Sequence, residues 1–201
     1  MSPATQTSVV ATSLLLVFAG LALGCGDKPT APTPAPLVPV VFQTIAELPI
    51  SNAFAAGPAR LAQSVTLPPG GTFNNIRFRW IPFPGAPPIE GALYIIDREY
   101  LGPVAAVSSA PGLVARSIRI ENGEYVFDTG VRLTGGTKYW FAADSDVGYL
   151  GSQPTSDIYP DGDLYFIGSL TGGETSYLRA FIYNQNERID SSFVLRGVRV
   201  Q

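Results

Sequence analysis

Acidic side chains gather between residues 142 and 163, the most polar stretch of the sequence. The stretch contains five aspartates: Asp144, Asp146, Asp157, Asp161 and Asp163. Ca²⁺ prefers oxygen ligands from carboxylates and backbone carbonyls on flexible loops. Asp144 with Asp146, and Asp161 with Asp163, have the i, i+2 spacing that lets two carboxylates reach one ion. The stretch is therefore a candidate Ca²⁺ site, with the formation and solvation of turns as the alternative role of its aspartates.

Aromatic residues accompany these acids. Tyr149 and Tyr159 fall between the expected strands, so we place them on loops, where an aromatic face beside carboxylates could stack on a sugar ring. Trp140 and Tyr165 fall within expected strands, and strand aromatics usually fill cores. Tyr149 and Tyr159 are therefore the candidate ligand-binding residues, with a glycan as the ligand.

Catalysis has few routes in this chain. Histidine is absent and Cys25 is the one cysteine, which excludes Ser-His-Asp triads, Cys-His dyads and imidazole zinc sites. Glycoside hydrolysis needs only two carboxyl groups, but at a fixed separation. No repeating pattern relates four of the acids outside the polar stretch, Glu90, Asp97, Glu99 and Glu121. We predict a non-catalytic protein, with a carboxylate-dependent glycan hydrolase as the alternative.

Charge limits the partners. The net charge is -3 and charged residues make up 14% of the chain, which offers no electrostatic basis for binding nucleic acid. Four arginines alternate with apolar residues on expected strands: Arg77, Arg79, Arg196 and Arg199. These side chains form either a solvated sheet face or a surface for an anionic glycan or lipopolysaccharide, because guanidinium binds carboxylate and phosphate in a planar fork.

The solitary Cys25 stands where an N-terminal apolar run ends. Residues 9–23 read VVATSLLLVFAGLAL, which is shorter than the roughly 20 residues of a membrane span and suits a secretory signal. Ala22, Leu23 and Gly24 before Cys25 resemble the lipobox of bacterial lipoproteins. The resemblance implies removal of residues 1–24 as a signal peptide and acylation of Cys25. An uncleaved apolar anchor and a secreted form with a free thiol are the alternatives.

The lipobox resemblance also implies a location. A lipidated Cys25 would attach the protein to the membrane of the cell envelope. Gly26, and not Asp, follows the cysteine. In Gram-negative lipoproteins this pattern resembles that of proteins exported to the outer membrane.

A proline-rich spacer follows in residues 25–39. Its sequence from residue 28, KPTAPTPAPLVP, contains proline at five of twelve positions. Proline fixes φ and removes a backbone donor, so neither helix nor sheet is expected there. We expect an extended polyproline II stalk between the lipid and a domain over residues 40–201.

The domain has the pattern of an all-β protein. Residues 73–82 alternate, with Ile76 and Phe78 on one face and Arg77 and Arg79 on the other. Asn-Gly at 122–123 between alternating apolar residues is a strong hairpin signal. About nine or ten short strands at these spacings predict a two-sheet antiparallel β-sandwich, jelly-roll-like. The aromatic residues expected in its core are Phe73, Phe78, Trp80, Tyr94, Phe127, Trp140, Phe141, Phe166, Phe181 and Phe193.

Three segments between about residues 60 and 184 resemble the secreted bacterial "choice-of-anchor" domains. They are AQSVTLPPGGT at 62–72, FDTGVRLTGGTKYW at 127–140 and YLRAFIY at 177–183. The resemblance implies an exported β-sandwich attached to the envelope by an interchangeable anchor, with no catalytic residues. We therefore expect a lipid-anchored binding or display module whose partner is a glycan or an envelope protein. A purely structural cell-surface subunit is the other alternative.

Overall fold

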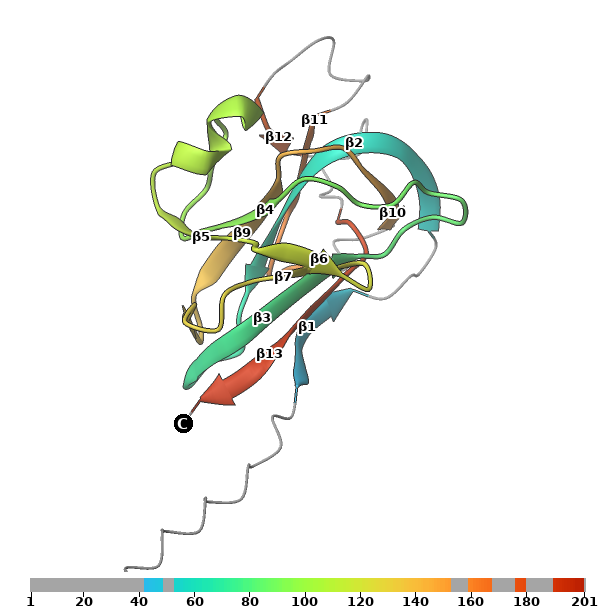
Figure 1. Ribbon diagram of the computed structural model, residues 1–201. Helices are drawn as coiled ribbons and strands as arrows, with labels where there is room; N and C mark the ends of the chain where they lie inside the picture. The colour runs from blue at the N-terminus through green and yellow to red at the C-terminus, as the bar shows by residue number, and fades with distance from the viewer. Residues whose placement is uncertain (1–41, 49–52, 153–158, 168–175, 180–189, 201) are drawn as a thin grey trace, which may run out of the picture. The chain divides into compact units, whose positions relative to one another are not determined.

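The computed structural model describes residues 42–48, 53–152, 159–167, 176–179 and 190–200. These residues form thirteen strands and one 3₁₀ helix (Figure 1). The strands make two antiparallel sheets, which confirms the all-β two-sheet prediction. The strand count exceeds the expected nine or ten because several strands, such as β8 (Leu133–Thr134) and β12 (Leu178–Arg179), are too short to show a period.

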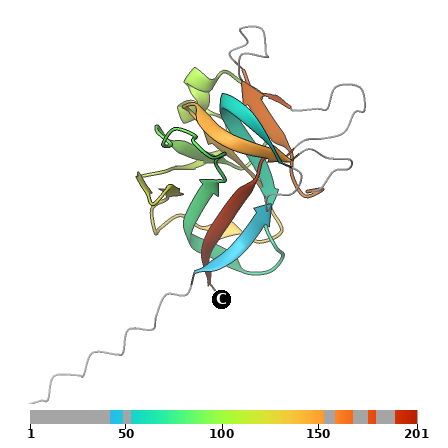
Figure 2. The same cartoon turned by 90° about the vertical axis from the view of Figure 1, so that its right-hand side faces the viewer.

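The six-stranded sheet joins the two ends of the domain. Its order is β1 (Gln43–Leu48), β13 (Phe193–Val200), β3 (Thr72–Trp80), β7 (Glu124–Val126) and β6 (Arg119–Glu121), and β8 also pairs with β3. The first and last strands are therefore neighbours, as Figure 2 shows for the blue and red ribbons.

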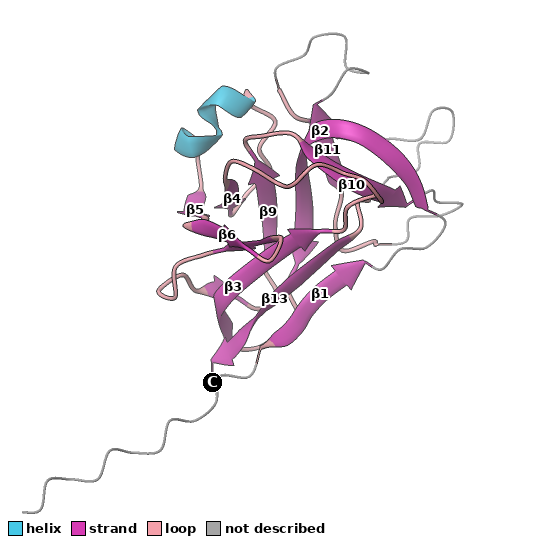
Figure 3. Cartoon of the chain, turned by 45° about the vertical axis from the view of Figure 1, so that its right-hand side comes forward, coloured by secondary structure: helices cyan, strands magenta, loops and turns pink. Residues whose placement is uncertain are grey.

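The seven-stranded sheet is built around the long strand β2 (Ala53–Thr66). Its order is β12, β11 (Leu164–Ile167), β2, β9 (Lys138–Ala143), β4 (Leu93–Ile96) and β5 (Leu113–Arg116), and β10 (Val147–Ser152) also pairs with β2. The 3₁₀ helix η1 (Val104–Ser109) lies between β4 and β5 in the chain (Figure 3).

Strand β3 illustrates how alternation creates the sandwich. Ile76, Phe78 and Trp80 are buried, whereas Arg77 and Arg79 are partly exposed, as the period of two predicts. The hairpin between β6 and β7 is also as expected. Asn122 has a φ of 53° and Gly123 a φ of 75°, so both central residues adopt the left-handed backbone of a type I′ turn.

The main core lies between the sheets and contains most of the expected aromatic residues. The centroid of the Phe78 ring lies 4.8 Å from that of Phe141 and 5.6 Å from that of Phe193. Seven of the ten expected residues are buried: Phe73, Phe78, Trp80, Tyr94, Phe127, Phe141 and Phe193. Trp140 and Phe166 are half-buried, and Phe181 lies outside the described residues.

A second apolar cluster covers the other face of β4. Leu93 and Ile95 belong to the main core, whereas Tyr94 and Ile96 pack with Val107 of η1 and with further residues of the second cluster. All four residues of β4 are therefore buried, although the strand lies next to the edge of its sheet. The helix η1 thus covers part of the outer surface, and its border with β4 forms the hollow described below.

Buried polar side chains form a network centred on Gln63 of β2. Its Nε2 donates to the Asp190 carboxylate at 3.0 Å, and its Oε1 accepts from the backbone N–H and the hydroxyl of Ser191, each at 3.2 Å. The Ser64 hydroxyl accepts from the Asp163 N–H at 2.8 Å. Buried polar groups need hydrogen-bond partners. The network therefore holds the segment before β13 against β2, near the C-terminal end of that strand.

Replacement of Gln63 tests this network. We expect Gln63→Leu to lower the free energy of unfolding by about 3 kcal/mol, because the buried Asp190 and Ser191 lose their hydrogen bonds to Gln63. Urea denaturation of the full chain measures the change. The matched control is Gln43→Leu, the same substitution at an exposed strand position, which we expect to be nearly neutral. Equal unfolding midpoints for Gln63→Leu and the wild type would contradict the prediction.

Candidate functional site

A hollow opens at the border between η1 and the outer face of the seven-stranded sheet. Its volume is about 360 Å³, and the residues that line it are Arg60, Tyr94, Val104, Ala105, Val107, Ser108 and Asp144. We call it the Asp144 hollow. It combines one carboxylate, one guanidinium and several apolar side chains, the composition that small-ligand sites generally share.

Asp144 is held in one orientation. It follows the end of β9, where its backbone N–H donates to the Ala92 carbonyl at 3.1 Å. Its Oδ1 accepts from the Ala92 N–H at 2.7 Å, and its Oδ2 accepts from the Tyr94 hydroxyl at 3.0 Å. Two fixed donors therefore orient the carboxylate, and its remaining lone pairs are available to a ligand hydroxyl.

Tyr94 connects Asp144 to a third strand. The Tyr94 oxygen accepts from Arg116 Nε of β5 at 3.1 Å while its hydroxyl donates to Asp144. Burial is the largest cause that raises the pKa of Tyr94 above its ordinary value of 10.0. The hydroxyl consequently keeps its proton at neutral pH and remains a donor to the carboxylate.

Arg60 supplies the cationic side of the hollow. Its Nε lies 3.4 Å from Asp146 Oδ1, and the two side chains are 45% and 58% exposed. Ion pairs this exposed contribute roughly 0–1 kcal/mol, so the guanidinium is only loosely held. The hollow therefore offers a rigid acceptor at Asp144 and an adaptable donor at Arg60, which suits a ligand with several hydroxyl groups.

The predicted calcium ligands are separated in the structure. Asp144 and Asp146 lie near the Arg60 part of β2, whereas the Asp163 backbone bonds to Ser64, about 13 Å further along the strand. The Asp161 carbonyl accepts from the Thr66 N–H at 3.1 Å and from the Thr66 hydroxyl at 2.7 Å.

Asp157 lies outside the described residues. Within the described ranges, no three acidic or cysteine side chains come close enough together to hold a metal ion. The Asp144 carboxylate accepts from a backbone amide and from a tyrosine hydroxyl, and the Asp146 carboxylate pairs with Arg60. The backbone carbonyl of Asp161 accepts hydrogen bonds from Thr66.

The two candidate tyrosines differ in their placement, and Tyr159 is not among the described residues that line the Asp144 hollow. Tyr149 was expected on a loop, and this placement is wrong: it lies within β10, opposite Ala56 of β2. Tyr159 packs its ring edge-on against Phe193 at 5.4 Å and is partly buried against the main core. The loop expectation failed because β10 begins only a few residues after β9, with no glycine or proline between them.

The arginine face carries its own counter-ions. Arg77 lies 3.0 Å from Glu121 and 3.4 Å from Glu124, and Arg196 lies 3.2 Å from Glu124. Arg199 donates to the Pro69 and Gly70 carbonyls instead, at 3.1 and 2.7 Å. Most of the expected anionic-glycan surface is thus engaged within the protein. Of the four arginines, Arg77 also borders a second hollow.

Arg60 and Tyr94 were not among the predicted ligand-binding residues, although Tyr94 was expected in the core. The two residues are far apart in the sequence, and each looks like an ordinary member of a strand pattern. A usable signal was that Arg60 directly precedes the apolar alternation of residues 61–67.

Comparison of the chain with models of known protein families, with curated proteins and with solved structures found no match. Among the residues that the structure describes, no helix is long and apolar enough to cross a membrane. The resemblances to lipoproteins and to "choice-of-anchor" domains therefore stay predictions, and the function has to be argued from the geometry of the site.

A double-mutant cycle tests the coupling of Tyr94 to Asp144. We expect Tyr94→Phe and Asp144→Asn each to lower the free energy of unfolding by about 1 kcal/mol, because each weakens the same charge-assisted hydrogen bond. The double variant should lose about 1 kcal/mol less than the sum of the two. Chemical denaturation of the four proteins gives the coupling. Strictly additive losses would show that the hydrogen bond does not stabilise the fold.

Proposed function

We propose that this protein is a lipid-anchored, exported, non-catalytic β-sandwich that binds a glycan in the Asp144 hollow. The observation that carries the proposal is the fixed Asp144 carboxylate facing a loosely held Arg60 in a hollow of about 360 Å³. Sugar hydroxyls donate to carboxylates and accept from guanidinium groups. A volume of this size accommodates a small ligand with both kinds of contact.

Binding suits the hollow better than hydrolysis. A glycosidase places two carboxyl groups roughly 5–9.5 Å apart, one on each side of the scissile bond. Asp144 is the one carboxylate among the described residues that line the hollow, and the nearby Asp146 is paired with Arg60. The lining therefore favours recognition, with glycan hydrolysis as the function that the experiment below must exclude.

The envelope location rests on the N-terminal sequence. The apolar run ending at Cys25 supports acylation, and the proline-rich residues 28–39 support a spacer between lipid and domain. A module held at the envelope in this way would display the Asp144 hollow toward surface glycans. In a Gram-negative source, the membrane would be the outer membrane.

Glycan-array binding tests the ligand class. We expect the detergent-solubilised full chain to bind a subset of neutral glycans, and Asp144→Asn or Arg60→Gln to weaken that binding at least tenfold. Asp144→Asn retains the size of the side chain and removes its charge. The matched control is Asp97→Asn at an exposed carboxylate paired with Arg98, which should bind like the wild type.

Two outcomes would contradict the proposed function. Release of product from a bound polysaccharide would make the protein a hydrolase. Absence of glycan binding, together with ordered self-assembly of the purified protein, would favour a structural subunit of the cell surface.

Intact-mass spectrometry tests the anchor. We expect the mature chain purified from a bacterial host to begin at Cys25 and to carry acyl groups, and to partition into the detergent phase. Cys25→Ser should abolish acylation, because serine lacks the thiol that is modified. A full-length chain starting at Met1, or a mature chain with a free thiol, would contradict the lipoprotein prediction.

A further inference from the structure

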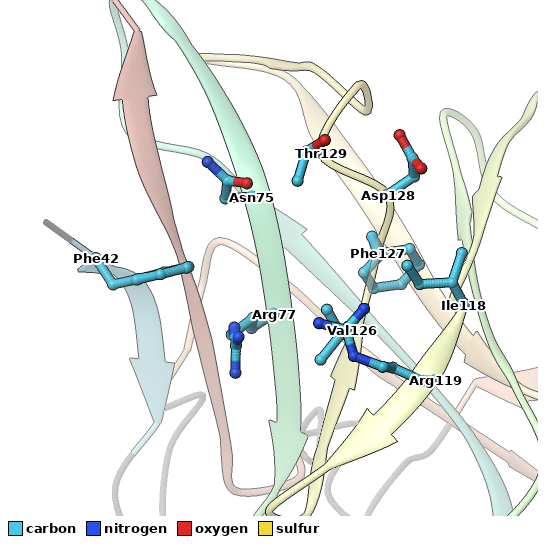
Figure 4. Close-up of a pocket in the computed structure, with 9 residues that line it drawn as sticks. All are labelled: Phe42, Asn75, Arg77, Ile118, Arg119, Val126, Phe127, Asp128 and Thr129. Atoms are coloured by element: carbon cyan, nitrogen blue, oxygen red, sulfur yellow. The ribbon is translucent and has the colours of Figure 1, made fainter. Parts of the chain in front are cut away.

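A second hollow lies on the Arg77 face of the six-stranded sheet. Its volume is about 120 Å³. The residues that matter for its chemistry are Phe42, Ile118, Arg119, Asp128, Thr129 and Asn75, with Arg77 at its side (Figure 4). We call it the Phe42 hollow. None of the described residues lines both this hollow and the Asp144 hollow.

A backbone irregularity in β3 shapes this hollow. Arg77 pairs with Arg196 and Asn74 with Val198, so two residues of β3 lie opposite the single Gly197 of β13. A Cβ atom on residue 197 would lie 2.9 Å from the Asn74 carbonyl oxygen, so glycine is required there. Such β-bulges occur next to functional sites, where they redirect side chains.

The bulge also holds Asn75 in an uncommon conformation. Its φ is 50°, and the other described non-glycine residue with a positive φ is Asn122, which the hairpin turn explains. Asn75 lies in the middle of a strand, where no turn requires this backbone. Strain of this kind persists where the surrounding structure enforces it and is typical of binding sites. The bulge brings Asn75 to the wall of the hollow.

The charges around the hollow leave one guanidinium in excess. Arg77 and Arg196 share Glu124 at 3.4 and 3.2 Å, and Arg77 also contacts Glu121 at 3.0 Å. Arg119 makes only a longer contact of 3.6 Å to Glu121, and its side chain is 51% exposed. Three guanidinium groups thus face two carboxylates in this network. Arg119 is the member best placed to bind an external anion.

Hydrogen-bond acceptors lie at the end of the Phe42 hollow opposite Arg119. Asp128 Oδ1 accepts from the Gly130 N–H at 2.7 Å, and Thr129 follows it in the chain. Figure 4 shows the Asp128 carboxylate well separated from the Arg119 guanidinium. A ligand across the hollow would therefore meet a cation at one end and oxygen acceptors at the other.

Apolar side chains border the space between these ends. Phe42 is 42% exposed and Ile118 is 56% exposed, so both side chains are accessible to a ligand. The Arg77 guanidinium lies 5.1 Å from the centre of the Phe42 ring, a cation–π contact that holds the ring in place. Phe42 and Ile118 thus present apolar surface to the C–H face of a compact ring.

We propose that the Phe42 hollow binds a uronate unit. Its carboxylate pairs with Arg119, its ring packs on Phe42 and Ile118, and its hydroxyls donate to Asp128 and Thr129. A volume of about 120 Å³ can receive one face of a single ring and is too small for an extended peptide. The site adds acidic-sugar recognition to the protein and does not depend on the Asp144 hollow.

Calorimetric titration of the detergent-solubilised full chain tests the proposal. The probes are glucuronate, glucose as its neutral counterpart and inorganic phosphate as a compact anion. We expect glucuronate to bind at least tenfold more tightly than either of the others. Arg119→Gln should weaken glucuronate binding at least tenfold, and Phe42→Ala should weaken it severalfold.

The controls separate the two sites. Arg98→Gln removes the same charge from an exposed arginine outside the hollow and should leave glucuronate binding unchanged. In the Asp144→Asn background, glucuronate binding that remains belongs to the Phe42 hollow, so failure of the proposed function at the Asp144 hollow is distinguishable from failure here. Equal binding of phosphate and glucuronate would reduce the hollow to a simple anion site and overturn the proposal. It is also overturned if the folded protein does not bind glucuronate, or if Arg119→Gln binds it like the wild type.

Discussion

Phe78 stacks on Phe141 across the space between the two sheets, and the surfaces of the domain depend on this contact. The one cysteine of the chain precedes the domain, so no disulfide can join the sheets. Apolar packing has to hold them together, and the Phe78–Phe141 stack at 4.8 Å joins the two sheets. Trp80 and Phe193, from the same sheet as Phe78, pack against its ring at 4.6 and 5.6 Å. Such pairs add roughly 0.5–1.5 kcal/mol each beyond the area that they bury.

Because the packing between the sheets stabilises the domain, the outward faces of the sheets can form binding sites. On the seven-stranded sheet, η1 covers β4, and the Asp144 hollow forms at the border of that cover. On the six-stranded sheet, a bulge interrupts the regular ladder, and the Phe42 hollow forms beside it. Both hollows thus arise where the regular sandwich is modified, while the Phe78 packing beneath them stays regular.

The sequence predicted those features that repeat along a strand or occur within a few residues. The alternation around Phe78 and the Asn122 turn depend on local periodicity and backbone sterics, so both were predictable. The Asp144 hollow was not, because its partners come from separate strands and no period links them. The contact of Tyr159 with Phe193 was not predictable either, because a residue between strands can still pack against the core. Nothing in the local sequence singles out Glu124, yet its carboxylate lies 3.4 Å from Arg77 and 3.2 Å from Arg196.

The position of β13 has a consequence for the order in which the domain can fold. This strand lies between β1 and β3, from which it is far removed in the sequence. Without β13, β1 and β3 have no strand to pair with between them, and the six-stranded sheet cannot form in its native order. Completion of this sheet therefore depends on pairing between distant parts of the chain, and such nonlocal pairing slows folding.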